Sequence, residues 1–356
     1  MSANRRNTFH MVGCGGGGIN IVSFVAASLE QNMACLAAYT KRYIDTSTAN
    51  ITKVDHLPEE FHQIASGRRT VSELTGSGGD KLENLTDITA DTKAWIDKNG
   101  IVPTPGEYYV IVYSAVGGSG STIGTELVHQ LSTMGVPVIV VLVSETVDLF
   151  KTRYGLGTLA TLEHRAMNNG YVTPVMYVNH DSVESMGVDK LVKVNTRLAS
   201  QLEALFYVCS GMHESLDQED IKKLFAPNTY KTYKFPAGIY GLFGFTGEML
   251  PEYKPEGSLV AVVRHLVPQN SNIPAIEAMH YKTGIIDDIS SSDIKAVKVE
   301  KGVAIAMVAG YFTSEMSNLD AVLADKTKMA NAAMDAIAAG RHSTAGVSVR
   351  EDGLFI

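Results

Sequence analysis

A first glycine cluster, at residues 13–18, has the spacing needed to bind phosphate. It reads Gly-Cys-Gly-Gly-Gly-Gly, which satisfies G-x-G-x-x-G, and it follows an apolar run at 9–12. A helix is expected to begin near Asn20. Glycine lets the backbone approach a phosphate closely, and the helix N-terminus supplies N–H donors and a positive dipole. The cluster therefore predicts a phosphate-binding turn rather than a surface turn without a ligand.

A second glycine cluster, at 117–122, again joins an expected strand to an expected helix. It adds the hydroxyls of Ser119, Ser121 and Thr122, which can bond phosphate oxygens or magnesium-bound water. A single dinucleotide needs one such turn, whereas two turns on parallel strands of one sheet can hold a longer polyphosphate. No G-x-x-x-x-G-K-[ST] occurs, so a P-loop enzyme is excluded. The stretch 76–81 is either a third loop near the phosphates or a surface turn.

An NAD-dependent oxidoreductase is the competing interpretation of the first cluster. Residues 43–45 can form a second strand that ends in Asp45, and an acid at this place binds the ribose in NAD-binding folds. Alternatively, Asp45 caps a turn before Thr46. The oxidoreductase interpretation leaves the second cluster without a function.

The elements that position these clusters form an α/β pattern. Continuous runs rich in β-branched residues predict strands buried on both faces, hence a parallel sheet covered by helices. These runs lie at 9–12, 108–113, 136–143 and 172–178. The stretch 188–209 has apolar residues every three or four positions, which predicts one long helix packed on several sides. Helical spacing also marks 123–134 and about 319–339, and further strands are expected at 229–246, 258–267 and 302–312.

Composition narrows the class of protein. The chain has 356 residues, 45% hydrophobic, with a net charge of −8, which disfavours binding to nucleic acid or to a membrane surface through basic residues. Its cysteines, Cys14, Cys35 and Cys209, are too far apart to suggest a disulfide framework or a zinc site. No targeting segment or membrane-spanning run is visible. We therefore expect a protein of a reducing cytosol.

The two clusters resemble the nucleotide loops of the tubulin/FtsZ family. Residues 13–20 resemble the first loop of FtsZ, and 114–121 resemble the G-G-G-[ST]-G-[ST]-G signature, with Val116 in place of its first glycine. The likeness covers about residues 9–225. It implies a tubulin/FtsZ-like α/β fold, with a Rossmann-like parallel-sheet GTPase domain, a long central helix, a second α+β domain and a short tail. The expected divisions are 1–182, 183–225, 226–345 and 346–356.

The resemblance also implies a GTP or GDP site with Mg²⁺, without metal ligands of its own from the protein. Asn179 and Asn195 match the asparagines that read guanine in the family, where the amide suits the donors and acceptors of the base. Taken alone, Asn179 is a turn residue. The implied nucleotide contacts are Gly13, Cys14, Gly15, Gly16, Gly17, Gly18, Asn20, Asp45, Thr46, Gly117, Gly118, Ser119, Gly120, Ser121, Asn179 and Asn195.

Two acids after the long helix match the catalytic loop of the family. Asp217 and Asp220 fit its aspartates, and Ser215 stands where the family has asparagine. By residue type alone, Ser215 and Asp217 are helix caps. The resemblance implies that both acids reach the nucleotide of the next subunit and orient a water for attack, so that hydrolysis requires a filament contact. A nucleotide-binding filament protein without turnover is the alternative.

Within the family, the chain most resembles PhuZ-type proteins of large bacteriophages. The Ser-Gly-Ser of the second cluster, the stretch 43–46 and a short tail with two acids carry this likeness. It implies a homopolymer in the cytoplasm of an infected bacterium that positions the phage nucleus and its DNA, with phage capsids or the nucleus shell as further partners. The tail residues expected to contact a neighbouring subunit are Glu351, Asp352, Leu354 and Phe355. A disordered end is the alternative for the tail.

Overall fold

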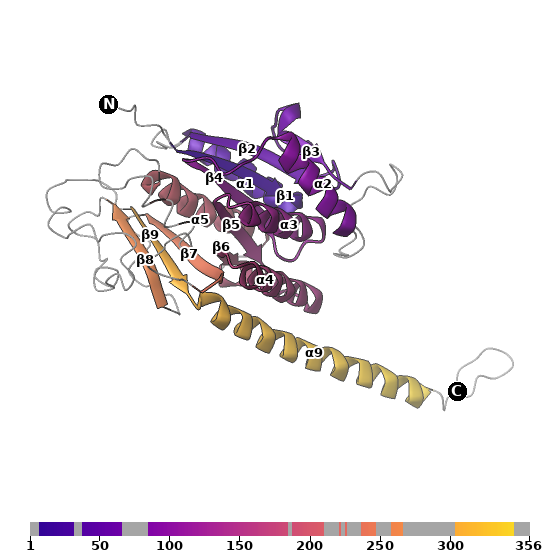
Figure 1. The fold of residues 1–356 in the computed structure, drawn as a ribbon. Helices are drawn as coiled ribbons and strands as arrows, with labels where there is room; N and C mark the ends of the chain where they lie inside the picture. The colour runs from indigo at the N-terminus through magenta and orange to yellow at the C-terminus, as the bar shows by residue number, and fades with distance from the viewer. Residues whose placement is uncertain are drawn as a thin grey trace, which may run out of the picture.

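A nine-stranded sheet forms the centre of the molecule (Figure 1), in the order β3-β2-β1-β4-β5-β6-β7-β9-β8. This computed structural model describes residues 7–31, 38–65, 85–183, 187–209, 221, 225, 236–246, 258–265 and 303–344. Neighbouring strands from β3 to β7 are parallel, whereas β9 is antiparallel to both β7 and β8. The predicted α/β class, with a mostly parallel sheet, is therefore confirmed.

The elements have the following bounds. The strands are β1 (Thr8–Cys14), β2 (Ala38–Asp45), β3 (Phe61–Gln63), β4 (Glu107–Ser114), β5 (Val138–Ser144), β6 (Val172–Asn179), β7 (Gly238–Thr246), β8 (Ser258–His265) and β9 (Val303–Ala309). The helices are α1 (Gly15–Gln31), α2 (Leu85–Lys98), α3 (Ser119–Thr133), α4 (Leu149–Asn169), α5 (Gly187–Val208) and α9 (Tyr311–Thr344), with short 3-10 turns η1 (Ile51–Lys53), η2 (Pro58–Glu60) and η4 (His180–Ser182).

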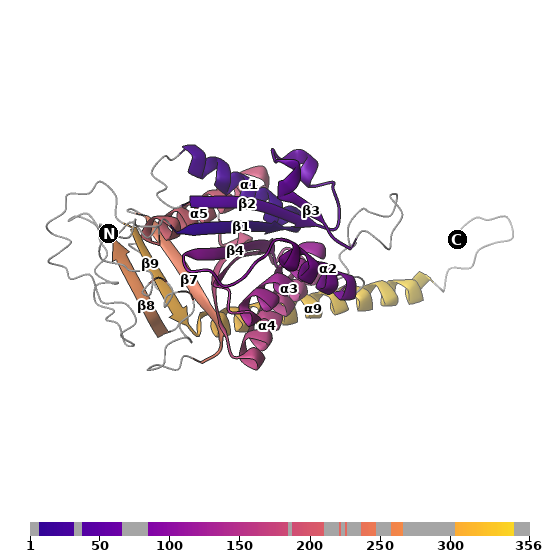
Figure 2. The ribbon, with the colours of Figure 1, turned by 45° about the horizontal axis from the view of Figure 1, so that its top comes forward.

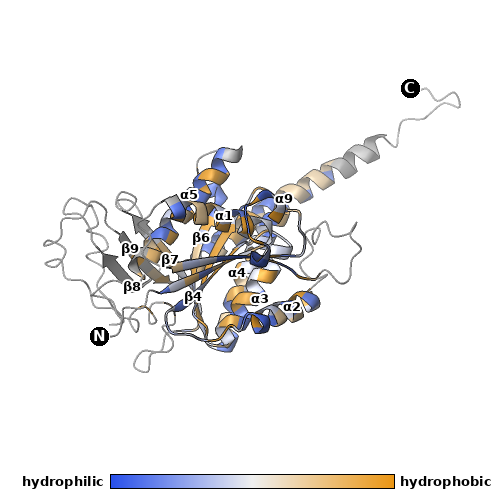
Figure 3. Cartoon of the chain, turned by 90° about the horizontal axis from the view of Figure 1, so that it is seen from above, coloured by the Kyte–Doolittle hydropathy of each residue, from blue (hydrophilic) through white to orange (hydrophobic). Residues whose placement is uncertain are grey.

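Alternate side chains of each parallel strand enter two separate hydrophobic cores. In β1, Phe9 and Met11 pack in one core, and Val12 and Cys14 pack in the other. Helices α1 and α5 cover the first face, and α2, α3, α4 and α9 lie on the second (Figure 2). In Figure 3, β6 is coloured as hydrophobic, while α2 and α5 alternate between hydrophilic and hydrophobic residues. Burial on both faces explains the continuous apolar runs.

Several predicted boundaries are wrong. Helix α1 begins at Gly15 rather than near Asn20, and α3 begins at Ser119 rather than at 123. Glycine and serine have low helix propensity, so both clusters were expected to be loops, but tertiary packing overrides that preference. The strand expected to reach 312 ends at Ala309, because Gly310 has a left-handed backbone (φ +80°) and α9 follows at once.

The long helix expected at 188–209 is confirmed as α5, but its first turns are less covered than expected. Leu191 and Val192 are 50% and 47% exposed, whereas Val194 and Leu198 are fully buried. Strand β7 is hydrogen-bonded to β6, so the sheet continues across the boundaries expected at 182 and 225. The division into domains stays a prediction. Among the described helices, none is long and apolar enough to cross a membrane.

Candidate functional site

The two glycine clusters lie against each other at the carboxyl ends of β1 and β4. These strands are adjacent and parallel, with Cys14 opposite Tyr113. Gly15 has a left-handed backbone (φ +65°), and a Cβ added there would lie 2.5 Å from the Cα of Gly120. The backbones of the two clusters therefore touch, as expected if both clusters contribute to one site.

Two helix N-termini meet at this contact. Helix α1 begins at Gly15 and α3 at Ser119, and neither has an acidic residue in its first turn. The residue before α3, Gly118, makes no side-chain cap to that helix. The first N–H groups of a helix lack partners within it, and its dipole is positive at this end. Two such ends side by side form a place suited to a multiply charged anion such as a polyphosphate.

Gly18 and Gly117 differ in how closely the rest of the chain approaches them. A Cβ on Gly18 would lie 2.1 Å from the carbonyl oxygen of Val112, so this residue lets α1 approach β4. At Gly117, the nearest atom to an added Cβ is the carbonyl oxygen of Ser114, at 4.0 Å. Packing within the described chain therefore requires glycine at 18 but leaves the space beside Gly117 open.

The turn after β2 joins the second cluster. Thr46 Oγ1 and Ser119 Oγ form a hydrogen bond of 2.8 Å. The Asp45 carboxylate accepts hydrogen bonds from the Thr46 amide (2.8 Å) and from Asn50 Nδ2 (3.1 Å). Burial raises the pKa of Asp45, and the hydrogen bonds, which favour the charged form, offset only part of this rise. The structure thus places Asp45 and Thr46 next to the glycine clusters, with the carboxylate holding its own turn.

The side chains of some predicted contacts are already engaged within the protein or lie in solvent. Ser121 and Thr122 donate their hydroxyls to the carbonyl oxygens of Gly117 and Gly118, within the start of α3. Cys14 is fully buried, and burial raises the pKa of its thiol, so only its main chain can contact a nucleotide. Asn20 lies on α1 with an exposed side chain.

Of the two residues expected to read the base, Asn179 lies farther along the same edge of the sheet, and Asn195 lies on α5. Asn179 ends β6, opposite Ser144 at the end of β5, and its Oδ1 accepts a hydrogen bond from the Asp181 amide at 3.0 Å. Asn195 is half-buried, about two turns into α5. The strand order β1-β4-β5-β6 puts the loop after β5, residues 145–148, between the glycine clusters and Asn179.

Sequence reasoning missed this loop and the residue that holds it. Asp181 accepts hydrogen bonds from the amide (2.6 Å) and the hydroxyl of Thr146, and it pairs with Lys190 Nζ at 3.2 Å. Burial alone would raise the pKa of Asp181, but these partners outweigh it and lower the pKa. The position of 145–148, directly after a predicted strand, was the available signal, because ligands of parallel sheets bind at the carboxyl ends of strands.

Other predicted residues lie outside the described part of the chain. They are the catalytic candidates Asp217 and Asp220, the stretch 76–81, and the tail residues Glu351, Asp352, Leu354 and Phe355. Their roles stay predictions.

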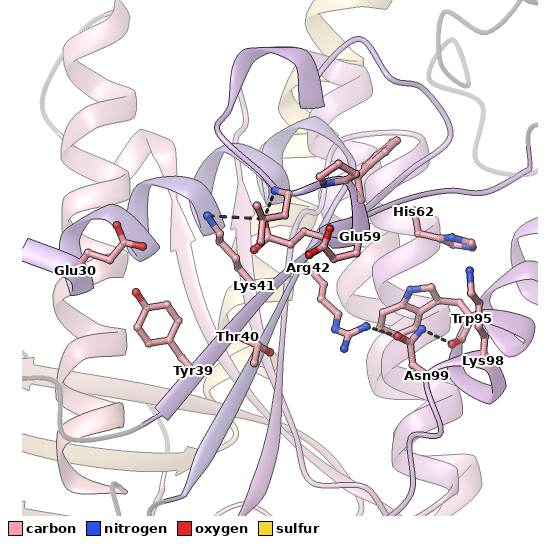
Figure 4. Close-up of a pocket in the computed structure, with 14 residues that line it drawn as sticks. Glu30, Tyr39, Thr40, Lys41, Arg42, Glu59, His62, Trp95, Lys98 and Asn99 are labelled. Atoms are coloured by element: carbon pink, nitrogen blue, oxygen red, sulfur yellow. Dashed lines mark hydrogen bonds and ion pairs between the residues drawn. The ribbon is translucent and has the colours of Figure 1, made fainter.

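A cavity of about 770 Å³ lies along the outer edge of β2 and is separate from the glycine clusters (Figure 4). Arg42 bonds Asn99 there, and Lys41 pairs with Glu60 at 3.8 Å. The lining contains charges of both signs and none of the predicted nucleotide contacts. We therefore place the site at the glycine clusters. Within the described ranges, no group of three or more His, Cys, Asp or Glu side chains could hold a metal ion.

Comparison with known proteins finds similar chains among phage tubulin-like proteins. No protein-family profile matches the chain. It is 25% identical over 282 residues to a phage tubulin-like protein of Pseudomonas phage PhiPA3, covering 78% of this chain and 83% of the relative. It is 30% identical over 185 residues to the phage tubulin-like protein of Pseudomonas phage phiKZ, covering 50% of this chain and 53% of the relative.

Solved structures share the fold over nearly the whole chain. The phage tubulin PhuZ with GDP and the protofilament of TubZ from bacteriophage PhiKZ each give a TM-score of 0.64 at 18% identity, covering 98% of this chain and 99% of the other. The glycine clusters, the fold and the sequence similarity lead to the same assignment. The chain is similar in sequence to phage tubulin-like proteins and shares the fold of the phage tubulin PhuZ, in agreement with the predicted resemblance to the tubulin/FtsZ family.

Proposed function

We propose that the chain binds GTP, assembles into filaments and hydrolyses GTP within them. The observation that carries this proposal is the meeting of two helix N-termini at Gly15 and Gly120, beside the Thr46–Ser119 hydroxyl pair. The similar PhuZ structure contains GDP, and the similar TubZ structure is a protofilament. Both support a nucleotide-dependent polymer.

The strand order suggests how GTP would lie. Its phosphates would contact the glycine clusters, its ribose would contact the loop 145–148, and its base would reach Asn179 and Asn195. A magnesium ion bound with GTP would be held by oxygens of the phosphates. Such an ion neutralises charge on the transferring phosphoryl group.

Subunits would join head to tail, with Asp217 and Asp220 of one subunit completing the site of the next. Repeated contacts of this kind give open filaments. The edge that carries the site exposes apolar side chains, as expected for a surface that another subunit covers. These are Val147 (63% exposed), Phe150 (66%), Leu191 and Val192. In an infected bacterium, such filaments would position the phage nucleus.

The NAD-dependent alternative is less well supported. Asp45 would have to bind a ribose, yet its side chain is 2% exposed and both carboxylate oxygens already accept hydrogen bonds. That carboxylate is therefore not available to a ligand without rearrangement of the turn.

The Asp217→Ala variant tests the proposal. It should bind GTP as the wild type does and form longer-lived filaments, while hydrolysis per subunit falls by about 100-fold or more, because a carboxylate that orients the attacking water is gone. Glu219→Gln, in the same segment, is the matched control and should hydrolyse normally. Wild-type hydrolysis by Asp217→Ala would show that the assignment is wrong.

Two further measurements test assembly. The hydrolysis rate of the wild type should rise more than linearly with protein concentration, since one subunit completes the site of another.

Deleting residues 346–356 should reduce the polymer recovered by pelleting, and unchanged assembly would contradict the tail contact.

A further inference from the structure

The loop 145–148 is held from two opposite sides by residues that do not belong to the predicted nucleotide contacts. On one side, Asp181 of η4 binds both the amide and the hydroxyl of Thr146. On the other, Lys326 of α9 donates a hydrogen bond to the carbonyl oxygen of Val147, at 3.3 Å. Adjacent residues of one short loop are thus tied to two elements that are far apart in the sequence.

Asp181 also connects the loop to α5. One carboxylate oxygen accepts both bonds from Thr146, and the other pairs with Lys190 in the first turns of α5. The Asp181 amide binds Asn179 Oδ1, which ties the turn to the end of β6. Charge-assisted hydrogen bonds are stronger than neutral ones, so Asp181 is well suited to set the position of this loop.

The Lys326 side connects the loop to α9. This helix packs along α4 (Figure 1) and continues from Lys326 to Thr344, about 27 Å further at 1.5 Å per residue. Most of this part exposes its side chains up to residue 336, including Met329 at 72%. The Lys326–Val147 bond is therefore a direct contact between α9 and the loop.

We infer that Asp181 and Lys326 are positioning residues that hold the loop 145–148 against the bound nucleotide, and that α9 thereby controls nucleotide release. This inference rests on the proposed function. The loop lies between the part of the site proposed for the phosphates and the part proposed for the base. When Asp181 and Lys326 both bind the loop, the loop retains the nucleotide. When either bond is lost, the nucleotide dissociates faster.

Release of a fluorescent GDP derivative from the full chain, chased with unlabelled GDP, measures this effect. Asp181→Asn should raise the dissociation rate constant about tenfold, because the amide cannot accept from Thr146 and pair with Lys190 as a carboxylate does. Lys326→Met should raise this rate constant about threefold, because only one hydrogen bond, to an uncharged carbonyl oxygen, is lost. Asp189→Asn on α5 and Lys328→Met on α9, both exposed, are the matched controls and should behave as the wild type.

Further readouts separate positioning from a general loss of structure. In steady-state hydrolysis, Asp181→Asn should raise the KM for GTP and leave kcat within about twofold. Hydrogen exchange at the Thr146 amide should accelerate in Asp181→Asn, without nucleotide, while exchange in β4 and β5 stays unchanged. The double variant Asp181→Asn/Thr146→Val should release GDP no faster than Asp181→Asn alone, because Asp181 acts through Thr146.

The outcomes distinguish this inference from the proposed function. If the wild type bound no GDP derivative, both would be overturned. If the wild type bound it and the two variants released it at the rates of their controls, only the inference would be overturned.

Discussion

The two glycine clusters resemble each other in sequence, but Gly18 of the first and Gly117 of the second differ in what surrounds them, although Gly120 of the second is packed as closely as Gly18, with an added Cβ 2.6 Å from the Cys14 carbonyl oxygen. In the first, Gly18 lies so close to Val112 that a side chain would collide with backbone. In the second, the nearest atom to a side chain added at Gly117 is the Ser114 carbonyl oxygen, at 4.0 Å, so nothing in the described chain collides. The first cluster therefore serves packing as well as any ligand. Packing within the described residues does not require glycine at 117, and the phosphate of the proposed nucleotide would need the space beside it.

The largest expected effect comes from Gly18→Ala. Its Cβ would lie 2.1 Å from the Val112 carbonyl oxygen, so α1 must move away from β4. We expect the free energy of unfolding to fall by about 3 kcal/mol or more, measured by chemical denaturation. A variant as stable as the wild type would remove the distinction between Gly18 and Gly117.

Gly117→Ala should separate binding from stability. The position has room for a methyl group and its backbone is not left-handed, so the free energy of unfolding should change by no more than about 0.5 kcal/mol. GTP affinity should fall about tenfold, because the methyl group occupies the space of the phosphate. Isothermal titration calorimetry measures the affinity. If affinity were unchanged and stability lost, the comparison would be reversed.

Gly157→Ala is a control for the effect of glycine replacement itself. Gly157 is exposed in the middle of α4, with nothing within 4 Å of an added Cβ. Alanine should raise the free energy of unfolding by about 0.8 kcal/mol, because it favours the helix over the unfolded chain. GTP affinity should not change. A loss of stability here would mean that the Gly18→Ala result does not report packing at that position.

The sequence predicted the strands well and the details of the site less well. Runs such as 136–143 are apolar at every position because both faces of the sheet are covered, and that pattern is visible locally. Which glycine is needed for packing depends on contacts between β1, β4 and their helices, so no local pattern distinguishes Gly18 from Gly117. The Asp181–Thr146 contact joins residues 35 positions apart and is equally invisible in a single sequence.

The smallest predicted effect concerns the bond that joins the turn after β2 to the second cluster. Thr46→Val keeps the shape of the side chain and removes its hydroxyl, so the hydrogen bond to Ser119 is lost. GTP affinity should fall about threefold, and Ser119→Ala should cost about the same, because each change breaks the same bond. The double variant should be little worse than either single one in a double-mutant cycle. Additive losses would mean that each hydroxyl contacts the ligand separately, and the two clusters would then act as independent sites of contact rather than as one joined surface.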